Sequence, residues 1–218
     1  MRYRNLVFAS ALTAAALAVV AAVALERLPA GTQLPTHWGA DGMADRFADA
    51  GTALFMPVGL TILVSLVMAS LPSLEPLQDK LAQSAPLYRT AWAGLLGLMS
   101  LVEAMVAGPA FGIALPATTI LAGMGVFFVA LGNVLPKSRP GFFVGIRTPW
   151  TITDPDNWIA THRYGGRIMM AAGFALVVFA AAPMRGETRA SFVIAILLVT
   201  VATPVLYSFF YWRTSRRA

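Results

Sequence analysis

The sequence predicts an all-α integral membrane protein with six transmembrane helices and a short cytoplasmic interfacial helix between the fourth and the fifth. Of its 218 residues, 58% are apolar and 12% are charged, and the mean hydropathy is +0.71. Soluble domains have roughly 45–50% apolar and about 25% charged residues. The apolar residues gather in six long runs, and the basic residues flank these runs in small groups, as topology determinants do.

The first apolar run, residues 6–25, follows Arg2 and Arg4 and contains no charge. A basic start before an Ala-rich run also fits a cleaved signal peptide. However, the run exceeds the ~7–15 residues of a usual signal core, which favours a retained helix. Residues 26–51 are polar and contain Pro29 and Pro35, so we expect an exposed loop with its irregular backbone outside the lipid.

The remaining runs continue this alternation of apolar and polar segments. We expect spans at residues 52–71, 88–107, 117–134, 167–184 and 190–212. The sequence thus divides into an N-terminal three-helix region, residues 1–116, with an extracytoplasmic loop at 26–51. A C-terminal three-helix region follows at residues 117–218, with a cytoplasmic loop at 135–166.

The distribution of Lys and Arg predicts the orientation of these spans. If the amino terminus is cytoplasmic, twelve of the 16 basic residues fall on the cytoplasmic side. The four on the opposite side are Arg27, Arg46, Arg185 and Arg189. This asymmetry predicts a multi-pass protein of the bacterial cytoplasmic membrane with both termini in the cytoplasm.

Composition also limits the chemistry. The chain has no Cys, so disulfides and thiolate chemistry are excluded. The net charge of +6 comes without a nucleic-acid recognition motif, so we expect no direct nucleic-acid partner. His37 and His162 are the only histidines and fall on opposite sides in this topology. No metalloprotease, nucleophile-elbow or nucleotide-loop motif occurs, and we expect no enzymatic activity and no catalytic residue.

The most informative segment is the central stretch, residues 131–166, because it is polar yet dense in Asn, Arg, Trp, His and Gly. Asp154 before Pro155 predicts a helix start. We expect that helix to run to about Tyr164 and to stop or bend at the two glycines that follow. Trp158 and His162 are four residues apart on one face, which suits a membrane interface.

Several side chains of the central stretch are candidates for ligand binding or signalling. The Arg147 guanidinium has the chemistry to bridge a carboxylate, a lipid phosphate or helix-end carbonyls. The alternative is a set of interfacial anchors, which is the favoured interpretation for Lys137 and Arg139. The candidates are Asn133, Arg147, Thr148, Trp150, Trp158, His162 and Arg163.

The outer loop contains a second candidate site. His37, Asp41, Asp45 and Asp49 are spaced by four, so a helix would present them on one face. Glu103 lies near the outer end of the third span, where an ionisable group is a functional candidate. One hypothesis is a divalent metal at His37, Asp41 and Asp45, and another is a site for a cationic peptide. The alternative is a structural network, since Gly and Asp residues also form turns and helix caps.

The central stretch contains the run GNVLPKSRPGFFVGIRTPWTI, then Trp158, then THRYGG. These residues resemble the signature of the SdpI family of membrane immunity proteins. The outer segment LPTHWGADGMADRF is similar to a short domain of unknown function that often precedes this signature. Together the two similarities cover both polar loops and the helices beside them.

The resemblance implies a six-helix membrane protein that protects its cell from a secreted killing peptide. It also implies capture of a cytoplasmic repressor protein at the membrane when the peptide is bound. We therefore predict an immunity or receptor-like protein without a cofactor, whose partners are membrane lipids, a secreted peptide toxin and a cytoplasmic repressor. The alternative is a membrane enzyme or small transporter with an outer-face metal or proton site.

Overall fold

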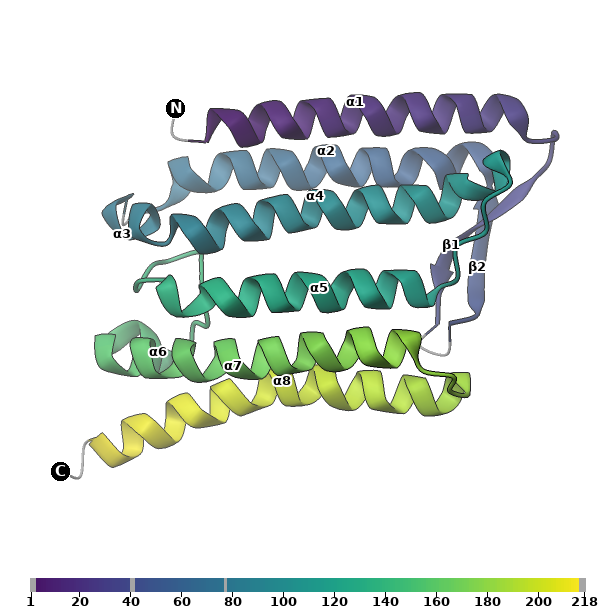
Figure 1. The fold of residues 1–218 in the computed structure, drawn as a ribbon. Helices are drawn as coiled ribbons and strands as arrows, with labels where there is room; N and C mark the ends of the chain where they lie inside the picture. Colours follow the sequence, from purple (N-terminus) through teal and green to yellow (C-terminus); the bar gives the residue numbers. More distant parts are fainter. Residues whose placement is uncertain (1–2, 40–41, 77, 216–218) are drawn as a thin grey trace.

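The computed structural model describes residues 3–39, 42–76 and 78–215 as an elongated helical bundle (Figure 1). Within these residues, six helices are long and apolar enough to cross a membrane, which confirms the predicted fold class. The third is extended by the 3-10 turn η1 (Gly108–Phe111), and the fourth by η2 (Leu135–Lys137). The six helices are α1 (Arg4–Arg27), α2 (Ala50–Leu74), α4 (Ala85–Ala107), α5 (Thr118–Val134), α7 (Pro155–Ala181) and α8 (Gly186–Ser215).

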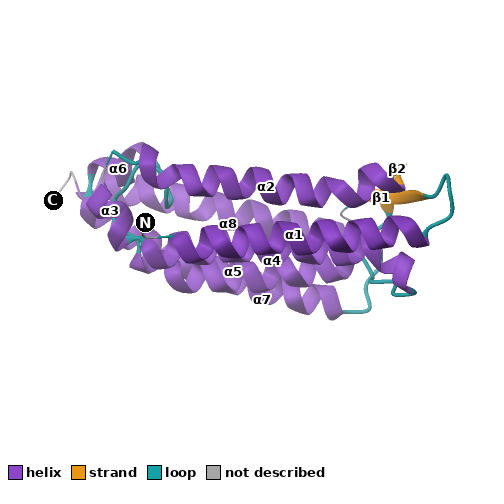
Figure 2. Cartoon of the chain, turned by 90° about the horizontal axis from the view of Figure 1, so that it is seen from above, coloured by secondary structure: helices purple, strands orange, loops and turns teal. Residues whose placement is uncertain are grey.

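The two polar regions lie at opposite ends of the bundle (Figures 1 and 2). One end holds an antiparallel hairpin of β1 (Gln33–Trp38) and β2 (Ala44–Asp49), which connects α1 to α2. The other end holds α3 (Gln78–Gln83) and α6 (Pro149–Thr153), near both ends of the chain. The separation of the outer loop from the central stretch therefore agrees with the predicted alternation of loops.

The helices pack as two groups, which meet mainly where α4 contacts α5. In the first group, α1, α2 and α4 all contact one another. In the second group, α7 lies between α5 and α8 and contacts both. In the first group, Tyr88 donates a hydrogen bond to the Met68 carbonyl, and Trp92 Nε1 donates to Ser10 Oγ at 2.8 Å. Large apolar side chains such as Leu63 and Val201 remain exposed on the outside of the bundle. Such a surface suits a multi-pass membrane protein, because lipid tails are as apolar as the side chains.

Glycines bring α5 and α7 into backbone contact. A Cβ on Gly132 would lie 2.6 Å from the Gly166 carbonyl oxygen, and one on Gly166 would lie 2.7 Å from that of Gly132. One heptad away on each helix, Gly125 and Gly173 repeat this reciprocal contact at 2.6 and 2.5 Å. Small residues at such positions let membrane helices approach closely.

Two expectations about local structure are wrong. The helix expected to stop or bend at Gly165 and Gly166 continues through them, so the fifth span begins at Pro155 and not at residue 167. The glycines serve packing, since a Cβ on Gly165 would lie 2.6 Å from Ile146 Cδ1. The short helix before this span is α6, at Pro149–Thr153.

The outer segment with His37 and Asp45 is also not helical, because it forms the hairpin. Pro35 lies inside β1, where it lacks an N–H that a helix interior would require. Gly42 has a φ of +86°, which supports the reversal of the chain between the strands.

Candidate functional site

The loop between η2 and α6, residues 138–148, folds back onto the bundle and is held there by side chains from the N-terminal half. Glu75 follows α2, is buried, and accepts the N–H groups of Phe142 at 3.2 Å and Phe143 at 3.1 Å. Ser84 precedes α4, accepts the N–H of Arg139 at 2.9 Å and donates to the Arg139 carbonyl at 3.3 Å. The ends of α2 and α4 thus fix a loop that is 55 to 68 residues away in sequence.

Both ring nitrogens of His162 are engaged, and their partners determine the tautomer. Nε2 lies 2.8 Å from the backbone nitrogen of Ile146, which can only donate, and Nδ1 lies 2.8 Å from the Trp158 carbonyl, which can only accept. The neutral imidazole with its hydrogen on Nδ1 satisfies both contacts. His162 therefore joins the loop to α7 and has no free nitrogen for a metal or a proton transfer.

Trp158 and His162 share a face of α7, as predicted, but they do not lie at an exposed interface. Both are 0% exposed, and their rings stack with centroids 4.1 Å apart and planes at 17°. Trp158 Nε1 donates to Ser138 Oγ at 3.3 Å, so the loop covers the pair. The loop thus supplies polar partners for both rings inside the protein.

Gly145 is required for this closure. Its φ is +124°, and a Cβ there would lie 2.6 Å from both His162 Nε2 and Trp158 Cζ2. The glycine therefore allows the loop backbone to pass directly over the stacked rings.

A second buried network connects the same region to α8. Thr148 caps α6 and forms a capping box with Thr151, and its hydroxyl lies 3.0 Å from Ser208 Oγ. Asn157 donates to the Ser208 carbonyl at 2.9 Å and accepts from Thr161 at 2.9 Å. Every buried polar group named here has a partner, which is the condition for such a network to stabilise a fold.

The remaining predicted residues of the central stretch lie nearer the surface. Arg147 is exposed and donates to the carbonyl of Phe142, a residue of its own loop and not of a helix end. Trp150 packs against Phe209 of α8, with ring centroids 5.1 Å apart. Asn133 and Arg163 are exposed and line one groove between α5 and α7.

Several residues of this site escaped sequence reasoning. Thr161 is expected beside Trp158 and His162, and Asn157 lies four residues before it on the same helix, a spacing that could have identified Asn157. Glu75 and Ser208 gave no such signal, because their partners are more than 50 residues away in sequence.

At the other end of the bundle, the hairpin brings two predicted residues together. His37 Nδ1 lies 2.6 Å from Asp45 Oδ1, and the side chains are 50% and 51% exposed. The hydrogen bond from His37 lowers the pKa of Asp45 below its ordinary value of 3.8. Asp49 caps α2 by accepting the N–H of Thr52 at 2.9 Å. Asp41 lies outside the described residues.

Of the three residues expected to hold a metal, only His37 and Asp45 are described. Among the described residues, no group of three or more His, Asp or Glu side chains has the geometry to hold a metal ion. Glu103 is 1% exposed, whereas His37 and Asp45 are half exposed on the hairpin.

Glu103 lies inside the first helical group. On α4, the side chains of Leu98 and Leu101 face α5. Met99 and Val106 instead pack against buried residues of α1 and α2. These two residues are four and three positions from Glu103 and therefore lie on its face of the helix. Glu103 shares this second face, and no described residue forms a hydrogen bond with either of its carboxyl oxygens. Its environment is therefore apolar and differs from that of the hairpin pair.

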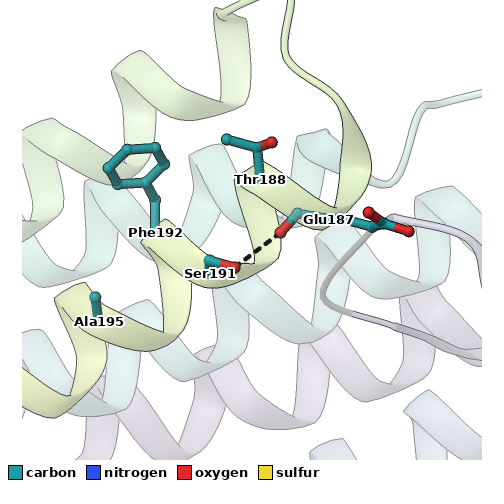
Figure 3. A pocket seen from close by; sticks show the side chains of 5 residues that line it. All are labelled: Glu187, Thr188, Ser191, Phe192 and Ala195. Atoms are coloured by element: carbon teal, nitrogen blue, oxygen red, sulfur yellow. Dashed lines mark hydrogen bonds between the residues drawn. The ribbon is translucent and has the colours of Figure 1, made fainter.

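A cavity of about 470 Å³ near the start of α8 is drawn in Figure 3. All its lining residues come from α8, and the dashed line marks the hydrogen bond from Ser191 to the Glu187 carbonyl at 3.1 Å. Since one helix supplies every wall, this cavity is an open helix surface and presents no converging groups for chemistry.

The fold and the central site define a class: a multi-pass, mainly helical membrane protein whose polar loop is packed onto its helices. Residues 137–208 match the SdpI/YfhL protein family, and residues 12–61 match a domain of unknown function, DUF1648. The predicted resemblance to the SdpI family is thereby confirmed, and the matched region includes the whole loop 138–148, α6, α7 and most of α8. Gly132 and Asn133 lie just before it.

Among curated proteins, the chain is similar to the immunity protein SdpI of Bacillus subtilis (strain 168). The two are 26% identical over 91 residues, which is 42% of this chain and 43% of the relative. The chain thus aligns with less than half the length of this curated relative. No solved structure matches the chain.

Proposed function

We propose that this protein is a non-catalytic membrane immunity protein that gives resistance to a secreted antimicrobial peptide. The observation that carries the proposal is the SdpI-type region at residues 137–208, together with the relative named as an immunity protein. The geometry supports a non-catalytic role, because His162 uses both ring nitrogens in internal hydrogen bonds.

The distribution of charge supports an orientation for this function. The start of α1 and the end of α8 lie at the same end of the bundle as the loop 138–148, and most basic residues of the described segments fall on that side. By the positive-inside rule this end is cytoplasmic, and the hairpin then faces the exterior, where it meets the peptide. The cytoplasmic end is the surface on which a repressor protein would bind.

Helix α2 provides a physical route between the two ends. Strand β2 leads directly into α2, Asp49 caps its first turn, and Glu75 follows its last turn. Its 25 residues make a rod about 37 Å long. A peptide that favours a different position of the hairpin would move Glu75, and the loop at Phe142 and Phe143 with it. Such a relay requires that the peptide binds one of two arrangements more tightly.

The test is survival of a peptide-sensitive bacterium that expresses the chain. The proposal predicts that wild-type protein raises survival and that His37→Ala and Arg147→Ala reduce it at equal membrane abundance. Gln33→Ala is the matched control, since Gln33 is exposed on the same strand as His37. Killing that is unchanged by the wild-type protein would reject immunity to the peptide used.

Recruitment of a regulator is tested separately. With the peptide present, a cognate repressor fused to a fluorescent protein should move to the membrane, and Glu75→Gln should abolish this movement without lowering membrane abundance. A repressor that stays in the cytoplasm while cells survive would reject the relay and keep immunity.

One observation favours a second candidate, a small transporter with a proton site. Glu103 is a buried carboxyl in α4 with no hydrogen-bond partner among the described residues. An ionisable group within a span often marks a transport path. The test is proton uptake by vesicles that contain the purified protein. Uptake that Glu103→Gln abolishes would support this candidate. Uptake equal to that of empty vesicles would reject it.

A further inference from the structure

A groove of about 320 Å³ lies on the outside of the bundle where α5 and α7 cross. Gly132 and Gly166 are in backbone contact at this crossing, so no side chain from either position occupies the groove. Asn133 and Pro136 contribute one wall, and the other comes from α7. The α7 residues are Arg163, Arg167 and Met170.

The polar side chains of the groove are not used by the fold. Asn133, Arg163 and Arg167 are all exposed. None of the three forms a hydrogen bond or an ion pair with another described residue. Two guanidinium groups and one amide therefore present their donors outward around one groove.

The spacing of these residues places the two charges together. Arg163 and Arg167 are four residues apart, so they are neighbours on one face of α7. The guanidinium fork matches the geometry of phosphate oxygens and binds them through two parallel hydrogen bonds. The polar end of the groove thus has the chemistry of a phosphate site.

An apolar strip continues from this polar end along the same helix faces. Phe174 and Val178 extend the α7 stripe of Arg163, Arg167 and Met170 at intervals of four residues, and are 58% and 62% exposed. On α5, Val126 lies two turns from Asn133 and is 62% exposed. Because α5 and α7 are both long and apolar enough to span a bilayer, this strip faces acyl chains.

We propose that the groove binds one anionic phospholipid. Arg163 and Arg167 hold its phosphate, Asn133 donates to a headgroup oxygen, and one acyl chain lies along Met170, Phe174 and Val178. The order of charged and apolar residues along α7 matches the order of headgroup and chain in a lipid. A soluble anion would contact only the charged residues. Basic pockets between membrane helices bind such headgroups. This site is independent of the proposed immunity function.

The test is native mass spectrometry of the purified full chain in detergent with added phosphatidylglycerol or phosphatidylcholine. Wild-type protein should retain one phosphatidylglycerol at least about tenfold more tightly than phosphatidylcholine. Arg163→Gln with Arg167→Gln should remove this preference. The charge-matched control, Arg4→Gln with Arg213→Gln, changes exposed arginines on α1 and α8 and should keep it. Circular dichroism melts check that both double variants fold.

Two further measurements identify the source of the phosphate. Phe174→Ser should weaken phosphatidylglycerol binding, and glycerol phosphate should fail to displace the lipid at equal concentration. Equal affinity for the two lipids, or an equal loss in both double variants, would overturn the site. Displacement by glycerol phosphate with no effect of Phe174→Ser would make the groove a site for soluble phosphate and would overturn the lipid assignment.

Discussion

Gly145 lies where the loop backbone crosses the stacked rings of Trp158 and His162, and both its conformation and its space exclude a side chain. Gly145→Ala should therefore reduce thermal stability by two effects. A positive φ costs an L-residue roughly 1–2 kcal/mol, and overpacking adds about 1–3 kcal/mol. Gly31→Ala is the matched control, because its φ is +80° and a Cβ there would meet nothing within 4 Å. Equal losses for the two variants in thermal unfolding would contradict the crowding.

The pair of His37 and Asp45 makes the hairpin sensitive to acid. A carboxyl whose pKa is lowered in the folded state contributes stability above its ordinary pKa and loses it as the pH falls through the lower, folded value. The contribution of Asp45 to hairpin order should thus decrease as the pH falls below about 4. A titration of the Asp45 carboxyl and the hairpin amides by NMR measures this, with Asp45→Asn as the flat control. Titration of Asp45 at or above 3.8 would contradict the hydrogen bond.

Glu103 destabilises the folded state, because it is buried in an apolar environment without a partner among the described residues. Burying an unpaired polar group costs about 1–3 kcal/mol. Glu103→Leu should therefore raise the melting temperature in detergent, and Met99→Leu on the same face should leave it nearly unchanged. A lower melting temperature for Glu103→Leu would show that the carboxyl stabilises the fold.

The residues of the central site illustrate what the sequence could predict at this scale. The shared face of Trp158 and His162 follows from helical spacing alone. Their burial does not, because it depends on Ser138 and Ile146, which reach them through the path of a loop that contains no periodic pattern.

At the scale of elements, Gly165 and Gly166 show why local residue preferences gave a wrong helix end. A Gly pair after a helical pattern usually ends a helix. Here packing against α5 and Ile146 requires the absence of a side chain inside a continuous helix. Tertiary contact therefore reverses the local preference. The hairpin is a similar case, since four-residue spacing of His and Asp fits a helix, but Pro35 and the turn at Gly42 favour strands.

The close contact of α5 and α7 predicts that alanine substitutions at Gly132 and Gly97 change stability in opposite directions. Gly132→Ala should destabilise the protein by roughly 1–3 kcal/mol, because a Cβ would lie 2.6 Å from the Gly166 carbonyl. Gly97→Ala is the control, since this helical glycine has nothing within 4 Å and Ala is about 1 kcal/mol better in a helix. The readout is unfolding by a denaturing detergent, and stabilisation by both variants would contradict the close crossing.

For the whole molecule, hydropathy was sufficient to predict six spans, because the requirement for about 20 apolar residues per span is simple and local. The length of the fifth span was not predictable in this way. Its first turns carry Asn157, Thr161 and His162, which are polar residues satisfied only inside the assembled bundle.

In the proposed topology, the hairpin faces the exterior and the loop 138–148 faces the cytoplasm. The chain contains no Cys, so single cysteines report accessibility without background. Phe47→Cys in the hairpin and Phe142→Cys in the loop are matched, since both side chains are 58% exposed. In intact cells, a membrane-impermeant maleimide should label position 47, and position 142 should react only after the membrane is opened. Labelling of both positions in intact cells, or of position 142 alone, would contradict the account.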